Sequence, residues 1–284
     1  MLDEKRAPTY YNKTKENIGT EATKMQKYQE KKRTGMILLK TLYSFFLCLM
    51  VCFAPQVMGA GAKNGIVQGK ELFLQGRDAF YRSQTPLAEV MAILTAAKQS
   101  LHQTKNHEGY YWLGQVEYLL GEVAEVAGNK REAARGFTES ENRAKQALDL
   151  NKKSSDAHRL LADTYMRLMS YKGTLYMISH GPQALKLLKK ALSLDPNNYT
   201  ALNSLGMYYI NSPKLGGGSV NKGIEVLEEA LMSKDEFDNF ISHIWLGQAW
   251  QKKNKKTEAI RHFKEALLIY PHNSWAKSLL EGCE

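Results

Sequence analysis

The glycine run Gly216-Gly217-Gly218-Ser219 is the segment whose composition comes nearest to a phosphate-binding loop. Such a loop needs a preceding strand, a Lys-Ser or Lys-Thr pair after the last glycine, and a helix N-terminus aimed at the anion. Here Ser219 is followed by Val220 and Asn221, so the lysine is missing. We therefore interpret the run as a turn between two helices, with Ser219 or Asn221 as the N-cap of the second helix.

Histidines and nucleophiles are present, but their spacing does not define a reactive site. His158 and His243 stand far apart, and neither has a second ligand at helical spacing that would complete a metal site. No nucleophile, base and orienting group can be named together. The sequence predicts a protein that is not an enzyme, with no catalytic residue, no metal site and no cofactor.

Small and bulky residues between Phe240 and Asn273 follow the spacing of a helical hairpin. After Leu246 and Gly247, the next five marker residues stand 3, 12, 16, 19 and 24 positions beyond the glycine: Trp250, Ala259, Phe263, Ala266 and Pro271. The small residues allow two helices to approach, the bulky ones fill the space beside them, and the proline stops the second helix. The pattern resembles the tetratricopeptide repeat, a helix–turn–helix unit of about 34 residues that stacks on its own copies.

Earlier copies of the pattern support the resemblance. Good copies begin at Leu205-Gly206 and at Leu161-Ala162, and weaker ones begin at Leu113-Gly114 and near Gly76. The resemblance implies an all-α fold, a superhelix of stacked helix–turn–helix units spanning residues 63–284. Asn273 is expected to cap a short final helix that closes the stack.

Three copies are longer than the standard repeat, and the added residues fall at or near the turn inside each unit. These segments are 121–136, 170–182 and 211–219, and equivalent turns of a stacked array lie along one edge. We expect part of the added length to be extra helical turns, because residues 122–132 contain good helix formers. We also expect His180-Gly181-Pro182 to stop a helix. The clustering indicates either a working surface or turns that tolerate insertion.

In proteins with this repeat, five positions of each first helix line the concave inner face. The resemblance therefore implies a partner-binding face that combines cations, amides, tyrosines and methionine, which suits an extended peptide or a carboxylate-bearing ligand. The fixed Lys/Asn set of the chaperone-tail clamp of this family is absent. The candidate residues are Tyr111, Gln115, Tyr118, Arg159, Asp163, Arg167, Asn203, Met207, Asn211, Gln248 and Lys252.

The N-terminal region divides into a polar part, residues 1–35, and an apolar part, residues 36–62. The first part has nine Lys/Arg, five Asp/Glu and few large aliphatics, so we expect it to be disordered, and Met36 is a candidate start codon. The second has a basic flank, an uncharged core over residues 41–62 and the small-residue site Ala60-Gly61-Ala62. This combination predicts a secretory signal peptide, with a membrane anchor as the alternative. Attachment of a lipid to Cys52 is a third interpretation of this segment.

The charge and the cysteine content argue against nucleic-acid binding and against an internal disulfide. The net charge of +10 falls to an excess of five basic residues from Lys63 onward, which is too mild and scattered to predict nucleic-acid binding. Only Cys283 follows the apolar segment, so that part of the chain cannot form an internal disulfide.

These observations predict an exported, periplasmic scaffold that binds a protein or peptide in its concave groove. Its contact with a membrane would come only through an uncleaved or lipidated N-terminus, with residues 41–62 as an anchor in the alternative. The lengthened turns are loosely similar to the tetratricopeptide-repeat component associated with periplasmic TRAP-type solute transporters. This second resemblance implies a small-molecule-binding or transporter-accessory protein with a cavity between the lengthened helices.

Overall fold

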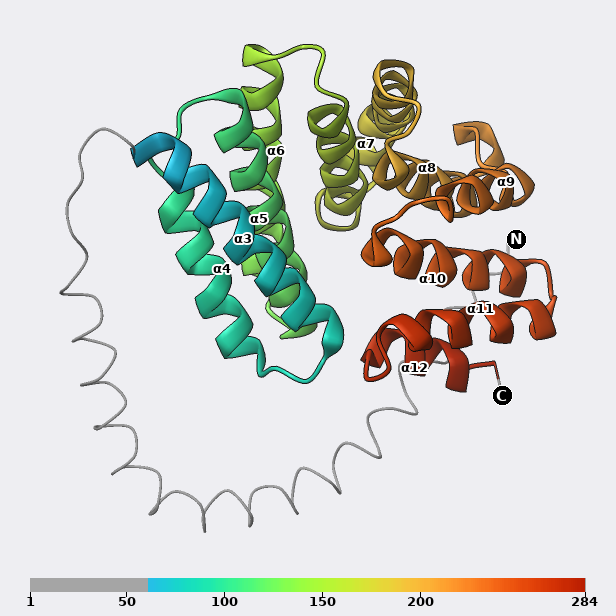
Figure 1. Cartoon of the computed structure of the whole chain (residues 1–284). Helices are drawn as coiled ribbons and strands as arrows, with labels where there is room; N and C mark the ends of the chain where they lie inside the picture. The colour runs from blue at the N-terminus through green and yellow to red at the C-terminus, as the bar shows by residue number, and fades with distance from the viewer. Residues whose placement is uncertain (1–60, 284) are drawn as a thin grey trace, which may run out of the picture. The chain divides into compact units, whose positions relative to one another are not determined.

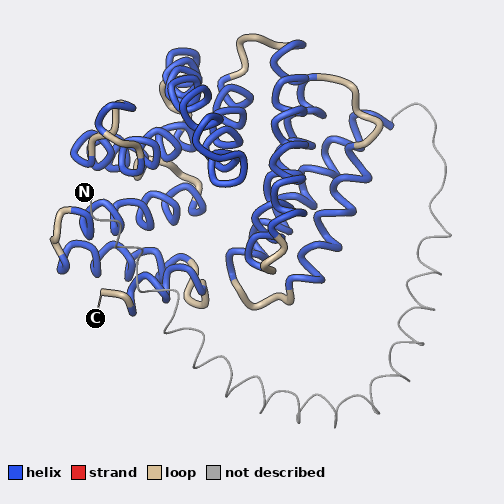
Figure 2. The backbone as a smooth tube through the Cα atoms, turned by 180° about the vertical axis from the view of Figure 1, so that it is seen from behind, coloured by secondary structure: helices blue, strands red, loops and turns tan. Residues whose placement is uncertain are grey.

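The computed structural model describes residues 61–283, and these residues form ten α-helices and one short 3₁₀ helix. Figure 2 shows helices joined by loops, and the described residues contain no strand. The helices are α3 (Gly61–Arg82), α4 (Leu87–Leu101), α5 (His107–Val126), α6 (Lys130–Leu150), α7 (Ser155–Leu194), α8 (Tyr199–Asn211), η1 (Lys214–Gly216), α9 (Val220–Ala230), α10 (Glu236–Lys252), α11 (Lys256–Ile269) and α12 (Ser274–Glu281). The polar segment 1–35 and the apolar segment up to residue 60 lie outside the described residues, so the predictions made for them stay predictions.

Consecutive helices pair into five hairpins that follow one another along the chain (Figure 1). The pairs are α3 with α4, α5 with α6, the two halves of α7, α8 with α9, and α10 with α11. Helix α12 packs on α11, and the side chain of Asn273 accepts a hydrogen bond from the backbone N–H of Ala276, 2.8 Å away. The predicted all-α fold, its repeat positions and its capped last helix are confirmed.

Glycines inside the hairpins explain the close approach of the paired helices. A Cβ atom added to Gly247 would collide with the ring of Phe263, and one added to Gly206 would collide with Leu227. In the second hairpin the two backbones themselves come close, where Gly136 lies against Gly121. Glycine is required at these positions because any side chain would push the two helices apart.

Two of the lengthened segments consist mainly of helix. Residues 121–136 extend α5 and α6, which leaves only a short turn around Gly128. In the third hairpin the turn is reduced to Gly173, whose φ of 78° breaks α7 into two halves. This left-handed backbone conformation favours glycine, because glycine has no Cβ atom to clash with the backbone.

The expectation that His180-Gly181-Pro182 stops a helix is wrong, because α7 continues through Pro182 to Leu194. Pro182 is exposed to solvent, so the backbone carbonyl that its missing N–H leaves unbonded can be hydrated.

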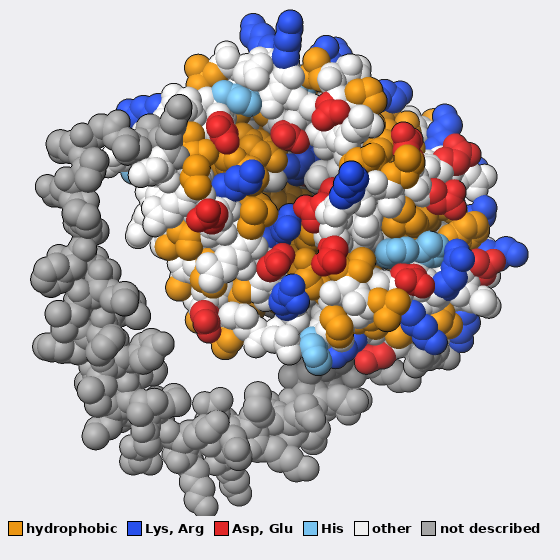
Figure 3. All heavy atoms as spheres, in the orientation of Figure 1, with side chains coloured by type: hydrophobic (Ala, Val, Ile, Leu, Met, Phe, Trp, Pro, Cys, Tyr) orange, Lys and Arg blue, Asp and Glu red, His pale blue; other side chains and the backbone are white. Residues whose placement is uncertain are grey.

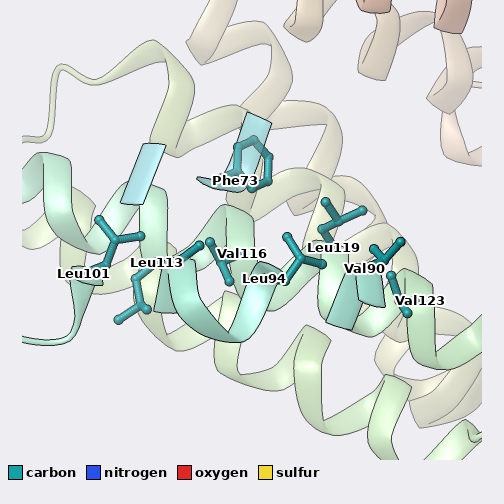
Figure 4. Close-up of a cluster of buried hydrophobic side chains, with 9 residues drawn as sticks. Phe73, Val90, Leu94, Leu101, Leu113, Val116, Leu119 and Val123 are labelled. Carbon is teal, nitrogen blue, oxygen red and sulfur yellow. The ribbon is translucent and has the colours of Figure 1, made fainter. Parts of the chain in front are cut away.

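The apolar core runs from hairpin to hairpin as a series of clusters. Figure 4 shows the first of these, where side chains from α3, α4 and α5 meet. It contains Phe73, Val90, Leu94, Leu101, Leu113, Val116, Leu119 and Val123. Each hairpin therefore buries its apolar face partly against the next one, as a stacked repeat requires.

The first and last hairpins also touch, although almost the whole described chain separates them in sequence (Figure 1). The ring centroid of Tyr81, near the end of α3, lies 4.8 Å from that of Phe237 in α10. The side-chain amide of Asn273 donates to the backbone carbonyl of Tyr81 at 2.7 Å, and the Tyr270 hydroxyl donates to Asp78 at 3.2 Å. We call this contact between α3 and α10–α12 the closing joint.

Among the residues that the structure describes, none of the helices has a stretch apolar enough and long enough to span a bilayer.

Candidate functional site

The inner face predicted from the sequence is built by the first helices of the hairpins, mainly α5, the first half of α7, α8 and α10. Its candidate residues fall into three groups: one buried, one partly exposed, and one at the boundary between α8 and α10. Figure 3 shows that the molecule is hollowed near its centre, with basic and acidic side chains around the hollow.

The buried group centres on Arg159 and Asp163, which are only 5% and 6% exposed. A guanidinium nitrogen of Arg159 donates to Asp163 at 2.9 Å, and a second donates to the Tyr111 hydroxyl at 3.2 Å. Gln115 donates to the same hydroxyl at 3.0 Å, and burial raises the pKa of Tyr111 to about 12. These four side chains bind one another and fix α5 against α7.

The partly exposed group centres on Arg167, whose side chain is 39% exposed. Its guanidinium donates to Glu122, to Glu125 at 3.1 Å and to the Tyr118 hydroxyl at 3.2 Å. Burial raises the pKa of Tyr118, so the hydroxyl stays protonated at neutral pH. One cation facing two carboxylates leaves this group with a net negative charge.

Two further tyrosines donate to the same carboxylates. The Tyr81 hydroxyl of α3 lies 3.1 Å from Glu122, and the Tyr171 hydroxyl lies 2.7 Å from Glu125. We call Arg167, Glu122, Glu125, Tyr118, Tyr81 and Tyr171 the Arg167 cluster. It joins helices from three hairpins and includes a residue of the closing joint.

The third group lies at the boundary between α8 and α10. Asn203 is 3% exposed; it donates to the backbone carbonyl of Asp238 at 2.9 Å and accepts from Ser242 at 2.6 Å. Lys252 donates to Asn211 at 3.0 Å and to the backbone carbonyl of Ile210 at 2.7 Å.

Two candidates of the third group have no such bond. Met207 and Gln248 are half-buried, and no hydrogen-bond partner is found for the Gln248 amide nitrogen among the described residues.

The structure thus brings together candidates that the sequence predicted, namely Tyr111, Gln115, Tyr118 and the α7 residues. The sequence did not show that these side chains bind one another. The acidic members Glu122 and Glu125, and Tyr81 from the first hairpin, were missed. Glu122 and Glu125 lie in a segment that the repeat pattern treats as an insertion, and Tyr81 is reached only through closure of the superhelix. The only signal in the sequence was the pair Glu122 and Glu125, whose spacing places both on one face of a helix.

A cavity between the lengthened helices would need the apolar side chains of the segment 170–182, such as Leu175 and Met177, to point inward. Leu175 is 84% exposed and Met177 is 44% exposed. Tyr176 stacks on His180 with a centroid distance of 3.7 Å. The two aliphatic side chains therefore do not line an enclosed centre.

A second titratable pair lies inside the last hairpin. The Nδ1 atoms of His243 and His262 are 3.0 Å apart, and His262 is 6% exposed. Burial lowers the pKa of both histidines, that of His262 to about 4. Within the described residues no group of three or more His, Cys, Asp or Glu side chains is placed to hold a metal ion.

Five stacked hairpins with a capping helix define a superhelical protein of the tetratricopeptide-repeat type. Residues 73–281 match the model of the family described as regulator of microtubule dynamics protein 1–3, and the chain belongs to this family. A comparison with curated proteins finds no match.

Solved structures share the fold at low sequence identity. TTC0263, a thermophilic tetratricopeptide-repeat protein of Thermus thermophilus, is 17% identical, with a TM-score of 0.53 over 78% of this chain and 98% of that one. The human IFIT1 dimer with PPP-AAAA is 16% identical, with a TM-score of 0.52 over 77% of this chain and 54% of that one. At such identities the likeness concerns the fold alone.

Proposed function

We propose that the described domain is a non-enzymatic scaffold that binds a segment of a protein partner on its inner face. The Arg167 cluster carries the proposal, because it combines charged and aromatic groups that stay partly exposed on that face. Its arginine offers donors to peptide carbonyls, and the 34% exposed side chain of Glu125 offers acceptors to amides or a basic side chain. Because the hairpins are already packed, little conformational entropy is lost on binding.

The family description connects members 1–3 with microtubule dynamics, so microtubules are the first partner to test. The full chain would be co-sedimented with microtubules and, in parallel, used to capture partners from an extract of its own cells. We expect binding by the wild type and by Arg135→Ala, and at least a tenfold weaker association of Arg167→Ala. Arg135 is a matched control, since it is an exposed arginine on α6 that is also paired with a glutamate.

Thermal unfolding of both variants would verify that the fold is kept. Unchanged capture by Arg167→Ala would remove the Arg167 cluster from the binding surface.

A small ligand bearing a carboxylate is the second candidate, and the closing joint favours it, because Tyr81 of the joint also contacts Glu122 of the Arg167 cluster. Such a ligand has to displace Glu122 or Glu125 from Arg167, since both arginines of the inner face already have carboxylate partners. A panel of mono- and dicarboxylates would be screened by thermal shift. If the inner face binds such a ligand, one of these compounds should raise the unfolding temperature of the wild type and of Arg135→Ala but not that of Arg167→Ala. TRAP-type transporter function is proposed only within this alternative.

Export to the periplasm is proposed on the N-terminal sequence alone, with anchoring by residues 41–62 as the alternative. Export and a microtubule partner exclude each other, because microtubules lie inside the cell. The mass of the native protein distinguishes them. A chain beginning near Lys63 in the soluble fraction supports cleavage, whereas a chain that keeps residues 41–62 in the membrane fraction supports anchoring.

A further inference from the structure

The second half of α7 differs in charge from the other outer helices of the superhelix. Between residues 174 and 224 the chain has a single acidic residue, Asp195, and five basic ones. By contrast, α9 carries Glu225, Glu228 and Glu229 within its eleven residues. The second half of α7 and the loop after α8 therefore present a cationic surface.

One exposed stripe of this half-helix combines aliphatic and basic side chains. Leu175, Ile178, Lys186 and Lys189 recur at helical spacing on the side away from the face that buries Ala184, Leu188 and Ala191. Leu175 is 84% exposed and Ile178 is 66% exposed, so the end of the hairpin is apolar and the rest of the stripe is basic.

The loop between α8 and α9 extends the stripe sideways. Gly217 lies next to the Leu185 side chain, which brings this loop beside the second half of α7. The loop presents Lys214 and the fully exposed Leu215. In the part of the chain that the structure describes, Lys186, Lys189 and Lys214 form no ion pair.

We propose that this surface, made of Leu175, Ile178, Leu215, Lys186, Lys189 and Lys214, docks the domain on an anionic lipid bilayer. Projecting aliphatic side chains beside unpaired lysines are the pattern of interfacial membrane binding. The leucines and isoleucine enter the boundary between headgroups and acyl chains, and the lysines meet the anionic headgroups. An acidic protein would need a shaped apolar pocket for each of the three projecting aliphatic side chains, whereas a bilayer takes up all three without one, so charge and apolarity together favour the bilayer.

The test uses the full chain and phosphatidylcholine vesicles with or without phosphatidylserine. Hydrogen exchange of residues 172–182 is the readout, because it reports on this surface separately from any binding by the N-terminal residues. We expect these residues to be protected from exchange only by vesicles that contain phosphatidylserine, and we expect Leu175→Asp/Ile178→Asp to lose this protection. Lys186→Gln/Lys189→Gln should weaken vesicle binding by about fivefold for each lysine removed.

Leu150→Asp/Met232→Asp is the matched control. Its two side chains are 57% and 70% exposed, and they lie at the opposite ends of the hairpins. We expect it to be protected like the wild type. The proposal is overturned by an absence of protection, by equal protection with pure phosphatidylcholine, or by protection that survives Leu175→Asp/Ile178→Asp. Protection by polyglutamate that exceeds protection by vesicles would also overturn it and would indicate an acidic protein instead.

Discussion

At the scale of single residues, the polar side chains of the inner face divide into those that hold helices together and those that stay available. Arg159 is almost fully buried with Asp163, and truncating one partner of such a pair leaves the other charge buried and unpaired. Arg167 has the same residue type and a similar place in the repeat, but its side chain remains partly exposed. Residue type alone therefore did not separate a structural arginine from an accessible one.

The buried histidine pair gives the domain a pH-dependent stability. Since the pKa of His262 is about 4 in the folded chain and near 6.5 when unfolded, the unfolded chain binds more protons between these values. Stability is therefore nearly complete at pH 7.5 and falls as the pH drops toward 4, by about 2 kcal/mol between pH 7.5 and pH 5. Urea unfolding at pH 7.5 and pH 5 would measure the loss.

His262→Gln should remove much of this pH dependence, whereas His102→Gln, at an exposed histidine, should keep it. An unchanged difference between the two pH values in His262→Gln would show that other groups cause it.

At the scale of the helices, glycines act through what lies beside them. Gly247 faces the Phe263 ring, so Gly247→Ala forces the helices apart and should destabilise the domain by about 1–3 kcal/mol. Gly181 is also helical, but its only neighbour within reach is the end of Met169, so Gly181→Ala should stabilise the domain by about 0.5–1 kcal/mol. Denaturant unfolding of both variants measures the change in the free energy of unfolding. A change of the same sign in the two variants would contradict this account.

The same scale shows how much of the fold the sequence could predict. Leu246, Gly247 and Phe263 define a hairpin because helix packing needs a small residue opposite a large one, and such pairs lie close in sequence. The length of α7 was not predictable in this way. Pro182 was expected to end a helix, but it lies on an exposed side of α7 and is tolerated there, whereas the break falls at Gly173.

At the scale of the whole molecule, the contact between the first and last hairpins has no counterpart in the repeat pattern. Tyr81 and Phe237 are typical core-forming residues, and no local sequence pattern predicts that they meet across more than 150 positions. Closure depends on the summed small rotations between hairpins, which the lengthened helices alter. The Arg167 cluster could be predicted only in part for the same reason, because Tyr81 reaches it through the closing joint.

The closing joint should unfold locally before the hairpins do. Tyr81→Ala removes the ring that packs on Phe237 and Phe240, and the hydroxyl that donates to Glu122. We expect faster hydrogen exchange in the first turns of α10 and in α12, with exchange in α6 unchanged, because few contacts other than the joint hold the two ends together. Tyr110→Ala is the control, since this half-buried tyrosine lies on α5 about 18 Å along the helix from Glu122. If exchange rose equally in α6, the joint would be part of one cooperative unit, and a partner could reach the hollow only from its open faces. If it rose in α10 and α12 alone, the joint would be the weakest point of the superhelix and the place where a long segment could enter.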